Sequence, residues 1–370
     1  MAFLGKKIFI TIIVVIGALG VFFAYKAGRT ITVIGNGGGD EFWEEAVSEF
    51  PPLPEREENR IDILLIGIRG YDGSGEWGRG EWLADTIILA SFNIENNQAA
   101  LVSLPRDLYV DIPGRGKDKI NAVYAIGETK NFGGGGIQLT KAIVSYITGV
   151  YVDHAVAIDF NGFEKIIDHL GGISIYRATP FAESKQWLGD GREGERYWRK
   201  RTFSATSTEG LLILESMSTS SKATIGDIVA GWEFYVPAGL NTMNSAETLY
   251  YARSRYSSSD FDRMHRQQEV IDAIKLKALN LGVLANPVKI FNIMDIVEKN
   301  LRTDISLSEI GDLVDLAQKV KIHELKKIVL DSSDDGLLVE DRVDGMYVLL
   351  PKAGSYAAIQ TVIKDIIQKE

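Results

Sequence analysis

The chain has 370 residues, 45% of them hydrophobic, so it can bury a sizeable core in one large domain or two modest ones. Its formal net charge of −10 at pH 7 argues against a nucleic-acid-binding protein, for which a broad basic surface is expected. The absence of cysteine excludes disulfides, thiolate zinc sites and cysteine nucleophiles. The 4 histidines are not spaced as metal ligands, so we expect His154 and His169 to be ordinary packed or exposed residues.

The N-terminus carries an uncharged run, Ile8 to Tyr25, directly after Lys6 and Lys7. Its length is near the lower limit for crossing about 30 Å of hydrocarbon. A cleaved signal peptide is the alternative, although its apolar region is usually shorter. We predict one N-terminal transmembrane helix within residues 1–30, with a cytoplasmic N-terminus and the remaining chain outside the membrane. Residues 31–59, rich in Gly, Pro and acidic side chains, are predicted to be a linker.

The remaining residues, 60–370, alternate short apolar runs with amphipathic segments and predict an α/β or α+β sandwich. Strands are predicted at 61–67, 83–89, 99–104, 155–159, 173–176, 328–330 and 347–350, and helices at 137–147, 162–170, 290–301, 307–320 and 355–368. Asn96-Asn97 indicates a tight turn that makes the second and third strands a hairpin. Periodicity weakens between 178 and 236, which predicts an elaborated loop or insertion, and residues from about 285 form a C-terminal extension.

Four arginines and two aspartates are concentrated between Tyr250 and Gln268. The segment before them, starting at Asn244 and Glu247, has the pattern of a helix with a capping box. After Asp260 the pattern is again helical, with a face that is cationic in its first two turns and apolar later. The arginines are Arg253, Arg255, Arg263 and Arg266, and Gln267 lies alongside.

Buried cations need partners, which leaves two interpretations of this stretch. One is an intramolecular salt-bridge network with Asp260 and Asp262. The other is an anion site, because guanidinium groups and backbone N–H groups at a helix start match phosphate or pyrophosphate.

Further candidate residues lie at the ends of the predicted strands. Arg106 follows a strand in Pro105-Arg106-Asp107, a position where sites are commonly built, although a local ion pair with Asp107 is the alternative. Asp85 stands at the entrance of a strand, where a turn or capping role is equally compatible. Lys119 is expected to be structural.

An ordered set of motifs in this sequence resembles the LytR-CpsA-Psr family of membrane-anchored extracytoplasmic proteins. The matching residues are Ile63–Gly67, Asp85-Thr86, Ser103–Asp107, Lys119–Asn121 with Ala125, Asp153-His154, Asp159-Phe160 with Gly162-Phe163, Asp168 with Gly171-Gly172, Arg253–Arg255, and Asp260 with Arg263 and Arg266–Gln268. They span roughly residues 61 to 281 in the order that the family has them.

The resemblance implies an α/β/α sandwich around a mixed central sheet, with a hydrophobic pocket for a polyprenyl chain. It implies a phosphotransferase that moves a glycopolymer from a polyprenyl-pyrophosphate carrier onto peptidoglycan or another envelope acceptor, using Mg²⁺ (or Mn²⁺). By motif position Asp85 is implied to be a metal ligand, and the catalytic residues are expected to be Arg106, Arg255 and Asp260. The implied pyrophosphate-binding residues are Arg106, Arg253, Arg255, Arg263, Arg266 and Gln267.

Two positions depart from the family's pattern. Arg69 stands where a second metal-binding aspartate is usual, and Asp72, further along the glycine-rich loop 70–80, is the possible substitute ligand. The arginine common before the Asp-Thr pair is replaced by Leu83-Ala84, so Arg69 or Arg79 is expected to supply that charge.

These departures keep two other functions open. One is a non-catalytic module that binds lipid-linked intermediates to scaffold or regulate envelope assembly. The other is a hydrolase that cleaves the polyprenyl pyrophosphate with water as acceptor. The general base also stays open, with Asp107 and Asp260 as candidates.

Overall fold

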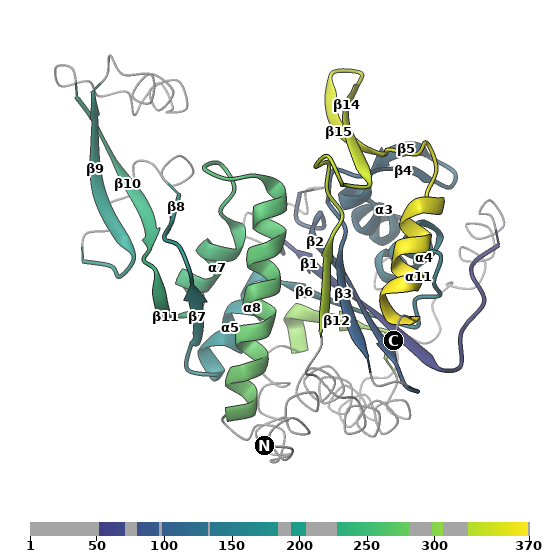
Figure 1. The fold of residues 1–370 in the computed structure, drawn as a ribbon, viewed down its shortest axis with the longest axis horizontal. Coiled ribbons are helices and arrows are strands. Elements are labelled where there is room, and N and C mark those ends of the chain that lie inside the picture. Colours follow the sequence, from purple (N-terminus) through teal and green to yellow (C-terminus); the bar gives the residue numbers. More distant parts are fainter. Residues whose placement is uncertain are drawn as a thin grey trace. The chain divides into compact units, whose positions relative to one another are not determined.

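The computed structural model describes residues 52–70, 80–95, 98–131, 134–183, 194–204, 228–280, 298–305 and 325–368 (Figure 1). The chain divides into two compact units: unit 1 comprises Met1–His169 and Lys275–Glu370, and unit 2 comprises Leu170–Ile274. The predicted membrane anchor at residues 1–30 and most of the predicted linker lie outside the described residues. Within the described part of the chain, no helix combines the length and apolar character needed to span a membrane.

A six-stranded mixed sheet lies at the centre of unit 1, in the order β12-β6-β1-β2-β3-β13. Its strands are β1 (Arg60–Ile68), β2 (Ala84–Asn93), β3 (Ala99–Ser103), β6 (His154–Asp159), β12 (Leu301–Thr303) and β13 (Lys326–Val329). The first three form an antiparallel meander, whereas β6 runs parallel to β1 and β13 runs parallel to β3. The predicted α/β class with a mixed central sheet is confirmed.

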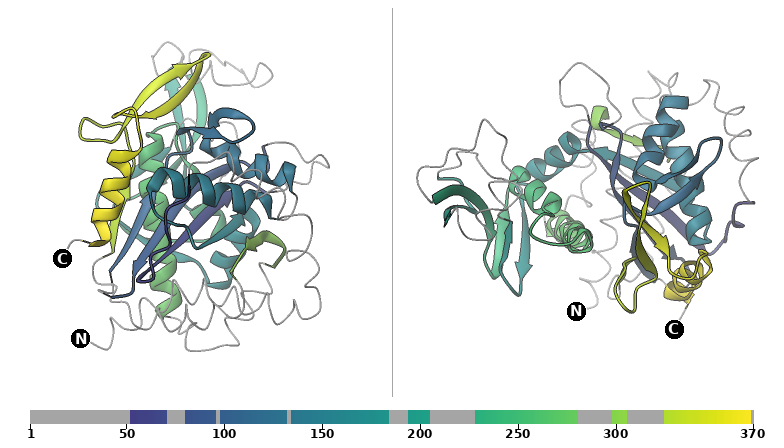
Figure 2. Two further views of the ribbon diagram at one scale, coloured as in Figure 1. Left: turned by 90° about the vertical axis from the view of Figure 1, so that its right-hand side faces the viewer. Right: turned by 90° about the horizontal axis from the view of Figure 1, so that it is seen from above.

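Helices pack on this sheet as their apolar spacing predicts. Helix α4 (Gly135–Thr148) contacts β6, and α11 (Ala357–Gln368) contacts β2 and β3. Figure 2 shows α11, coloured yellow, beside the strands in both further views.

Helix α3 (Val123–Lys130), which the sequence did not predict, packs closely on α4. Glycines permit this approach, because a Cβ at Gly127 or Gly135 would lie within 2.3 Å of the other residue's carbonyl oxygen. Helix α5 (Phe160–His169) follows β6, and short 3₁₀ turns occur at η1 (Ile120–Ala122) and η4 (Glu298–Asn300).

Two hairpins extend unit 1 beyond the sheet. One pairs β4 (Tyr109–Ile112) with β5 (Gly116–Lys119), and the other pairs β14 (Leu338–Val343) with β15 (Met346–Pro351). Asp344 and Gly345, with φ of 51° and 79°, form the two-residue turn between β14 and β15, as in a type I′ hairpin. Strand β15 contacts β4, and Figure 1 shows the two hairpins next to each other.

The C-terminal third contributes more to unit 1 than an extension would. Both edge strands of the central sheet, β12 and β13, come from it, so it completes the sheet. The helix predicted at 290–301 is wrong at its end, where η4 and β12 stand; the rest of it, and the helix predicted at 307–320, fall outside the described residues.

Unit 2 is built from two small antiparallel sheets and two helices. Strands β7 (Ile173–Arg177) and β11 (Gly239–Met243) pair, and β8 (Phe181–Glu183), β10 (Ile228–Val236) and β9 (Trp198–Ser204) form the second sheet. Helices α7 (Ser245–Arg253) and α8 (Asp260–Asn280) follow. The described part of the predicted insertion is thus mainly strand, and its Trp198 and Phe234 pack with Tyr250 at ring separations of 5.2 to 6.0 Å. Trp198 and Phe234 are buried in unit 2, and the half-buried Tyr250 packs against them.

Candidate functional site

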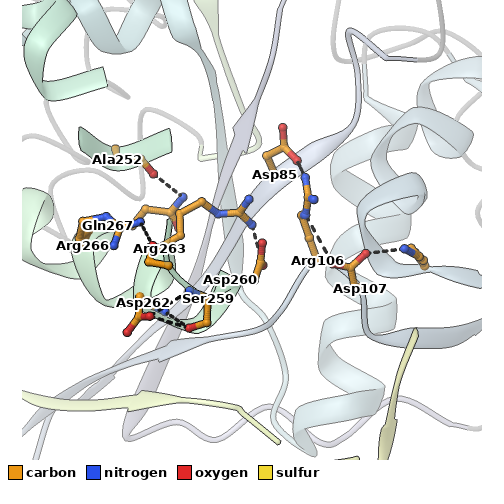
Figure 3. A network of polar contacts seen from close by, with 12 residues as sticks. Asp85, Arg106, Asp107, Ala252, Ser259, Asp260, Asp262, Arg263, Arg266 and Gln267 are labelled. Carbon is orange, nitrogen blue, oxygen red and sulfur yellow. Dashed lines mark hydrogen bonds and ion pairs between the residues drawn. The ribbon is translucent and has the colours of Figure 1, made fainter. Parts of the chain in front are cut away.

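Four side chains of unit 1 form an alternating chain of charges, here named the charge chain: Asp85, Arg106, Asp107 and Lys119. Arg106 Nη1 donates a hydrogen bond to Asp85 Oδ1 at 2.6 Å, and its Nε lies 3.6 Å from Asp107 Oδ2 (Figure 3). Lys119 Nζ donates to Asp107 Oδ1 at 2.5 Å. Arg106 therefore makes the local ion pair with Asp107 and also contacts Asp85, while its role in a site stays a prediction.

A β-bulge determines how Asp85 is presented. Gly67 of β1 pairs with Thr86, but the next residue, Ile68, pairs with Ala84, so Asp85 is the extra residue on β2. Bulges re-aim side chains and are common beside functional sites. Gly67 permits the close approach of the strands here, since a Cβ would lie 2.9 Å from the Thr86 Cβ. The Gly67 and Asp85-Thr86 motifs are thus two halves of one structural feature.

Backbone hydrogen bonds hold the segment of Lys119 against the segment of Arg106. Ile120 N donates to Leu108 O at 2.7 Å, and Asn121 N donates to Arg106 O at 3.2 Å. Two sequence motifs that are separate along the chain are therefore adjacent in unit 1. The Lys119 ammonium group fixes the Asp107 carboxylate, and the structural role expected for Lys119 stays a prediction.

The donors near Asp85 fit a Mg²⁺ ion only if substrate phosphates complete its shell. The Asp85 side chain is 35% exposed, and Mg²⁺ commonly takes one or two carboxylates plus phosphate oxygens. Arg69 lies exposed after β1 and offers no oxygen ligand, while Asp72 falls outside the described residues. Asp159 is committed elsewhere, because it accepts hydrogen bonds from Gly162 N and Asn300 Nδ2. No group of three or more acidic or histidine side chains suited to a metal occurs in the described ranges.

In unit 2, both predicted helix starts are capped. Asn244 and Glu247 form the predicted capping box of α7, each accepting at 2.8 Å. A second capping box begins α8: Ser259 N and Oγ donate to Asp262 Oδ2, and Asp262 N donates to Ser259 Oγ. Burial opposes ionisation of Asp262, but these hydrogen bonds and nearby Arg266 lower its pKa overall. Asp262 is therefore a helix cap.

Asp260, in the first turn of α8, has a different partner. Its Oδ2 accepts a hydrogen bond from Arg263 Nη2 at 2.8 Å (Figure 3), with the Asp260 side chain 25% exposed. Arg263 itself is only 4% exposed. The salt-bridge interpretation is thus correct for this pair and incorrect for Asp262, which holds Ser259 instead.

Arg266 and Gln267 bind the backbone of the preceding segment. Arg266, also 4% exposed, donates to Tyr251 O and Ser254 O and to Ser258 Oγ, and it stacks 4.4 Å from the Phe181 ring centroid. Burial lowers the pKa of Arg266, against the opposing effect of nearby acidic groups. Gln267 Nε2 donates to Ala252 O at 3.4 Å. Arg266 fixes the loop 254–259, here named the arginine loop, and Gln267 bonds the last turn of α7 directly before it.

A buried carboxylate that the sequence analysis did not single out also fixes the arginine loop. Glu183, with no exposed surface, accepts hydrogen bonds from Ser257 N at 3.1 Å and Ser257 Oγ at 2.7 Å. Glu183 lies in the weakly periodic stretch, so no sequence signal marked it. Arg253 and Arg255, which flank Ser254, are half-buried at either side of this anchored backbone.

A second network below the loop involves Glu269 of α8. Arg177 Nη1 donates to both Glu269 oxygens at 2.9 and 3.2 Å, and the Tyr251 hydroxyl donates to the same carboxylate. Burial raises the pKa of Tyr251, and this hydrogen bond raises it further. Tyr251 therefore stays protonated and acts as a fixed donor.

Comparison with known proteins gives one family. The LytR_cpsA_psr family model matches residues 43–365. TagU of Enterococcus faecalis, a polyisoprenyl-teichoic acid–peptidoglycan teichoic acid transferase, is 26% identical over 357 residues, which cover 92% of this chain and 88% of that protein.

Solved structures share the fold. Protein gbs0355 from Streptococcus agalactiae superposes with a TM-score of 0.57 at 22% identity, over 84% of this chain and 89% of that one. TagT bound to LIIa-WTA superposes with a TM-score of 0.53 at 21% identity, over 85% and 94%.

Proposed function

The chain belongs to the LytR-CpsA-Psr family, and on that basis we propose that it transfers a glycopolymer from a polyprenyl-pyrophosphate carrier onto peptidoglycan or another cell-envelope acceptor. The teichoic acid transferase activity in the name of its Enterococcus faecalis relative supports this class of reaction. The observation that carries the proposal is the position of Arg106, held 2.6 Å from Asp85 and 3.6 Å from Asp107 directly after β3. This arrangement presents a fixed cation beside an accessible carboxylate, as phosphoryl transfer requires.

The reaction we propose is a displacement at the phosphorus that carries the glycan. A hydroxyl oxygen of the acceptor forms a bond to this phosphorus, and the P–O–P bridge breaks. The bridging electron pair leaves with the polyprenyl monophosphate, so charge grows on that leaving group and on the non-bridging oxygens. Preorganised guanidinium groups stabilise such charge because they need no reorganisation during the step.

The roles of the arginines are proposed from the family motif. In unit 1 Arg106 binds phosphate oxygens of the donor, and in unit 2 Arg253, Arg255 and Arg263 are the proposed pyrophosphate-binding residues. Arg69, exposed after β1, is proposed to supply the charge of the arginine that is missing before Asp85-Thr86. Arg266 and Gln267, expected from the motif to bind pyrophosphate, are assigned a positioning role instead, because their donors bond the backbone of residues 251–254.

Asp260 is the proposed acceptor of the hydroxyl proton. Asp107 is less suited, because its two oxygens face Lys119 and Arg106. Asp260 has one oxygen on Arg263 and a side chain that is 25% exposed, so an acceptor hydroxyl has access to it.

Asp85 is the residue that would hold Mg²⁺ or Mn²⁺, together with the phosphates of the donor. When bound, such an ion neutralises phosphate charge and orients the pyrophosphate. Arg69, in place of a second carboxylate, predicts weaker metal binding than two carboxylates would give.

The proposal extends to the location and finer architecture of the protein. The uncharged run Ile8 to Tyr25 anchors the chain in the cell membrane, with the catalytic part outside and the linker 31–59 between them. The helices that cover the mixed sheet belong to the α/β/α sandwich that the family resemblance implies.

The test incubates the full-length chain in detergent with a short-chain polyprenyl-pyrophosphate disaccharide and a peptidoglycan fragment, with and without Mg²⁺. Phosphosugar covalently attached to the fragment is the expected result. Free phosphosugar with an unlabelled fragment would indicate a hydrolase. Tight lipid binding without turnover in either condition would indicate a scaffold, in which Arg69 is the decisive substitution.

A further inference from the structure

The β14–β15 hairpin exposes several apolar side chains, one of which lies near the charge chain. Val339, Met346 and Tyr347 are among the exposed large hydrophobic residues of unit 1, and all lie in this hairpin. Val339 and Met346 lie on the face of the hairpin opposite to Tyr347, because Val339 pairs with Leu350 and Met346 directly precedes Tyr347 in β15. Tyr347 is therefore the exposed apolar residue to relate to the charge chain. An isolated two-stranded hairpin is only marginally stable, so its contacts with the rest of unit 1 determine whether its side chains are held in fixed positions.

Backbone contacts fix the hairpin to the charge chain. Leu349 N donates a hydrogen bond to Asp107 O at 2.9 Å, and Leu349 also forms a parallel bridge with Leu108. Leu349 is 2% exposed, so this contact is a packed one. The hairpin is therefore anchored at the residue whose side chain holds both Arg106 and Lys119.

The strand register decides which side chains share the anchored face. Tyr347 lies two residues from Leu349 and is on the same face of β15. Arg342 is the partner of Tyr347 across the hairpin, so it belongs to that face as well. One face therefore carries the anchor, an aromatic ring and a guanidinium group.

Lys119 connects this face to the charge chain. Its Nζ lies 2.5 Å from Asp107 Oδ1 and 6.0 Å from the centroid of the Tyr347 ring, at the outer limit of a cation–π contact. Tyr347 is nevertheless 36% exposed. An accessible aromatic ring thus lies near Lys119, which holds Asp107, the residue that in turn holds Arg106.

We propose that Tyr347, with Arg342 beside it, binds a pyranose ring of the substrate. This proposal rests on the proposed function. The transferred phosphorus bears a sugar on one side and receives a sugar hydroxyl on the other, so a pyranose ring must lie one bridging oxygen away. Aromatic rings stack on the C–H face of a pyranose, while a neighbouring guanidinium group hydrogen-bonds its hydroxyl or carboxyl groups.

Steady-state kinetics of full-length Tyr347→Ala, Tyr347→Phe and Val339→Ala test the proposal. The substrates are the polyprenyl-pyrophosphate disaccharide and a peptidoglycan tetrasaccharide, each varied in turn. Tyr347→Ala should raise KM for one of them about three- to tenfold, with kcat changed less than about twofold. Tyr347→Phe keeps the ring and should retain the wild-type KM, and so should Val339→Ala, an exposed control in the same hairpin. The substrate whose KM rises identifies the sugar as donor or acceptor.

An unchanged KM for both substrates in Tyr347→Ala, or equal losses in Tyr347→Phe and Tyr347→Ala, would overturn the proposal. Calorimetric titration with each substrate separates this result from a failure of the proposed function. If the wild type binds a saccharide without transferring it, and Tyr347→Ala weakens that binding about threefold or more, the sugar site stands and the transferase does not. Equal binding by both forms overturns the sugar site whether or not transfer occurs.

Discussion

Asp85 Oδ1 accepts a hydrogen bond from Arg106 Nη1 at 2.6 Å, so the residue that resembles a metal ligand and the first arginine of the pyrophosphate set are direct partners. Asp85 reaches this position through a bulge in β2, and Arg106 through the end of β3. With Asp107 on its other side, the Arg106 guanidinium has a fixed direction before any substrate binds. Preorganisation of this kind is what electrostatic catalysis needs.

Arg106→Ala should reduce kcat/KM for transfer by about 10²-fold or more, because a fixed donor to the transition state is lost. Arg106→Lys should recover only part of the rate, since an ammonium cannot reproduce the planar fork. The measurements are the kinetics of glycopolymer transfer and the Tm of each variant.

Arg115→Ala is the matched control for Arg106, because Arg115 is an exposed arginine of the neighbouring β4–β5 hairpin, 3.8 Å from Asp118. Its activity and Tm should match the wild type. A Tm loss in Arg106→Ala large enough to account for the missing activity would instead assign Arg106 to the fold.

Asp260 and Asp262 should separate into a functional and a structural residue. Asp262→Ala removes half of the capping box of α8 and should cost about 1 kcal/mol of unfolding free energy, with activity per folded molecule preserved. Asp260→Asn should keep the Tm within a few degrees and lower kcat, with the acidic limb of the pH–rate profile lost. Denaturant titration of both variants measures their stability, and their pH–rate profiles measure their activity. If Asp262→Ala loses activity and Asp260→Asn loses only stability, Asp262 is the functional residue and Asp260 the structural one.

Asp62 should make the stability of unit 1 depend on pH. This carboxyl is 2% exposed in β1, and burial, only partly offset by Arg60, raises its pKa from 3.8 to about 6. The folded state therefore binds more protons than the unfolded state between about pH 4 and pH 6, so stability rises as pH falls through that window. The gain over the whole window is on the order of 2 kcal/mol.

Asp62→Asn should remove this pH dependence, whereas Asp341→Asn, at an exposed position of β14, should retain it. Denaturation midpoints of the wild type and the two variants, measured at about pH 4, 5, 6 and 7, provide the comparison. Parallel curves for wild type and Asp62→Asn would show that Asp62 is not the responsible group.

Arg69 and Asp85 should control affinity for a divalent cation. Arg69→Asp places a second carboxylate after β1 and should tighten Mn²⁺ binding in the presence of pyrophosphate, about tenfold or more. Asp85→Asn should weaken it. Electron paramagnetic resonance of free Mn²⁺ reads the affinity directly, independent of turnover. An Asp85→Asn protein that binds Mn²⁺ as the wild type does would remove Asp85 from the proposed metal site.

Much of unit 1 was predictable because buried strands and amphipathic helices have strong patterns. In unit 1 the continuous apolar run at Ile63–Gly67 corresponds to β1, and in unit 2 the Asn244–Glu247 capping box corresponds to the start of α7. The strand predicted at 347–350 corresponds to β15, but its partner β14 was missed although Asp344-Gly345 is a strong two-residue turn signal, because the residues of β14 lack clean alternation.

For the candidate site, the sequence identified the charged residues and offered Asp107 and Asp260 as ion-pair partners, but not the contact between Asp85 and Arg106. Nothing in the sequence pattern shows that Asp262 is a capping residue and that Asp260 pairs with an arginine. Ser259 is recognised as the N-cap only because the structure shows that α8 begins directly after it. Arg266 resembled its neighbour Arg263 in sequence, yet one binds backbone carbonyls and the other a carboxylate. Long-range partners such as Glu183, 74 residues from Ser257, leave no local trace.

The most direct test of the central claim is the activity and Tm of Arg255→Ala and Arg263→Ala, measured on the same preparations. If these arginines bind the pyrophosphate, both variants should lose transfer and donor binding while their Tm stays within a few degrees of the wild type. A melt lowered by many degrees, with residual activity that follows only the folded fraction, would contradict the account. The arginines would then be a structural network.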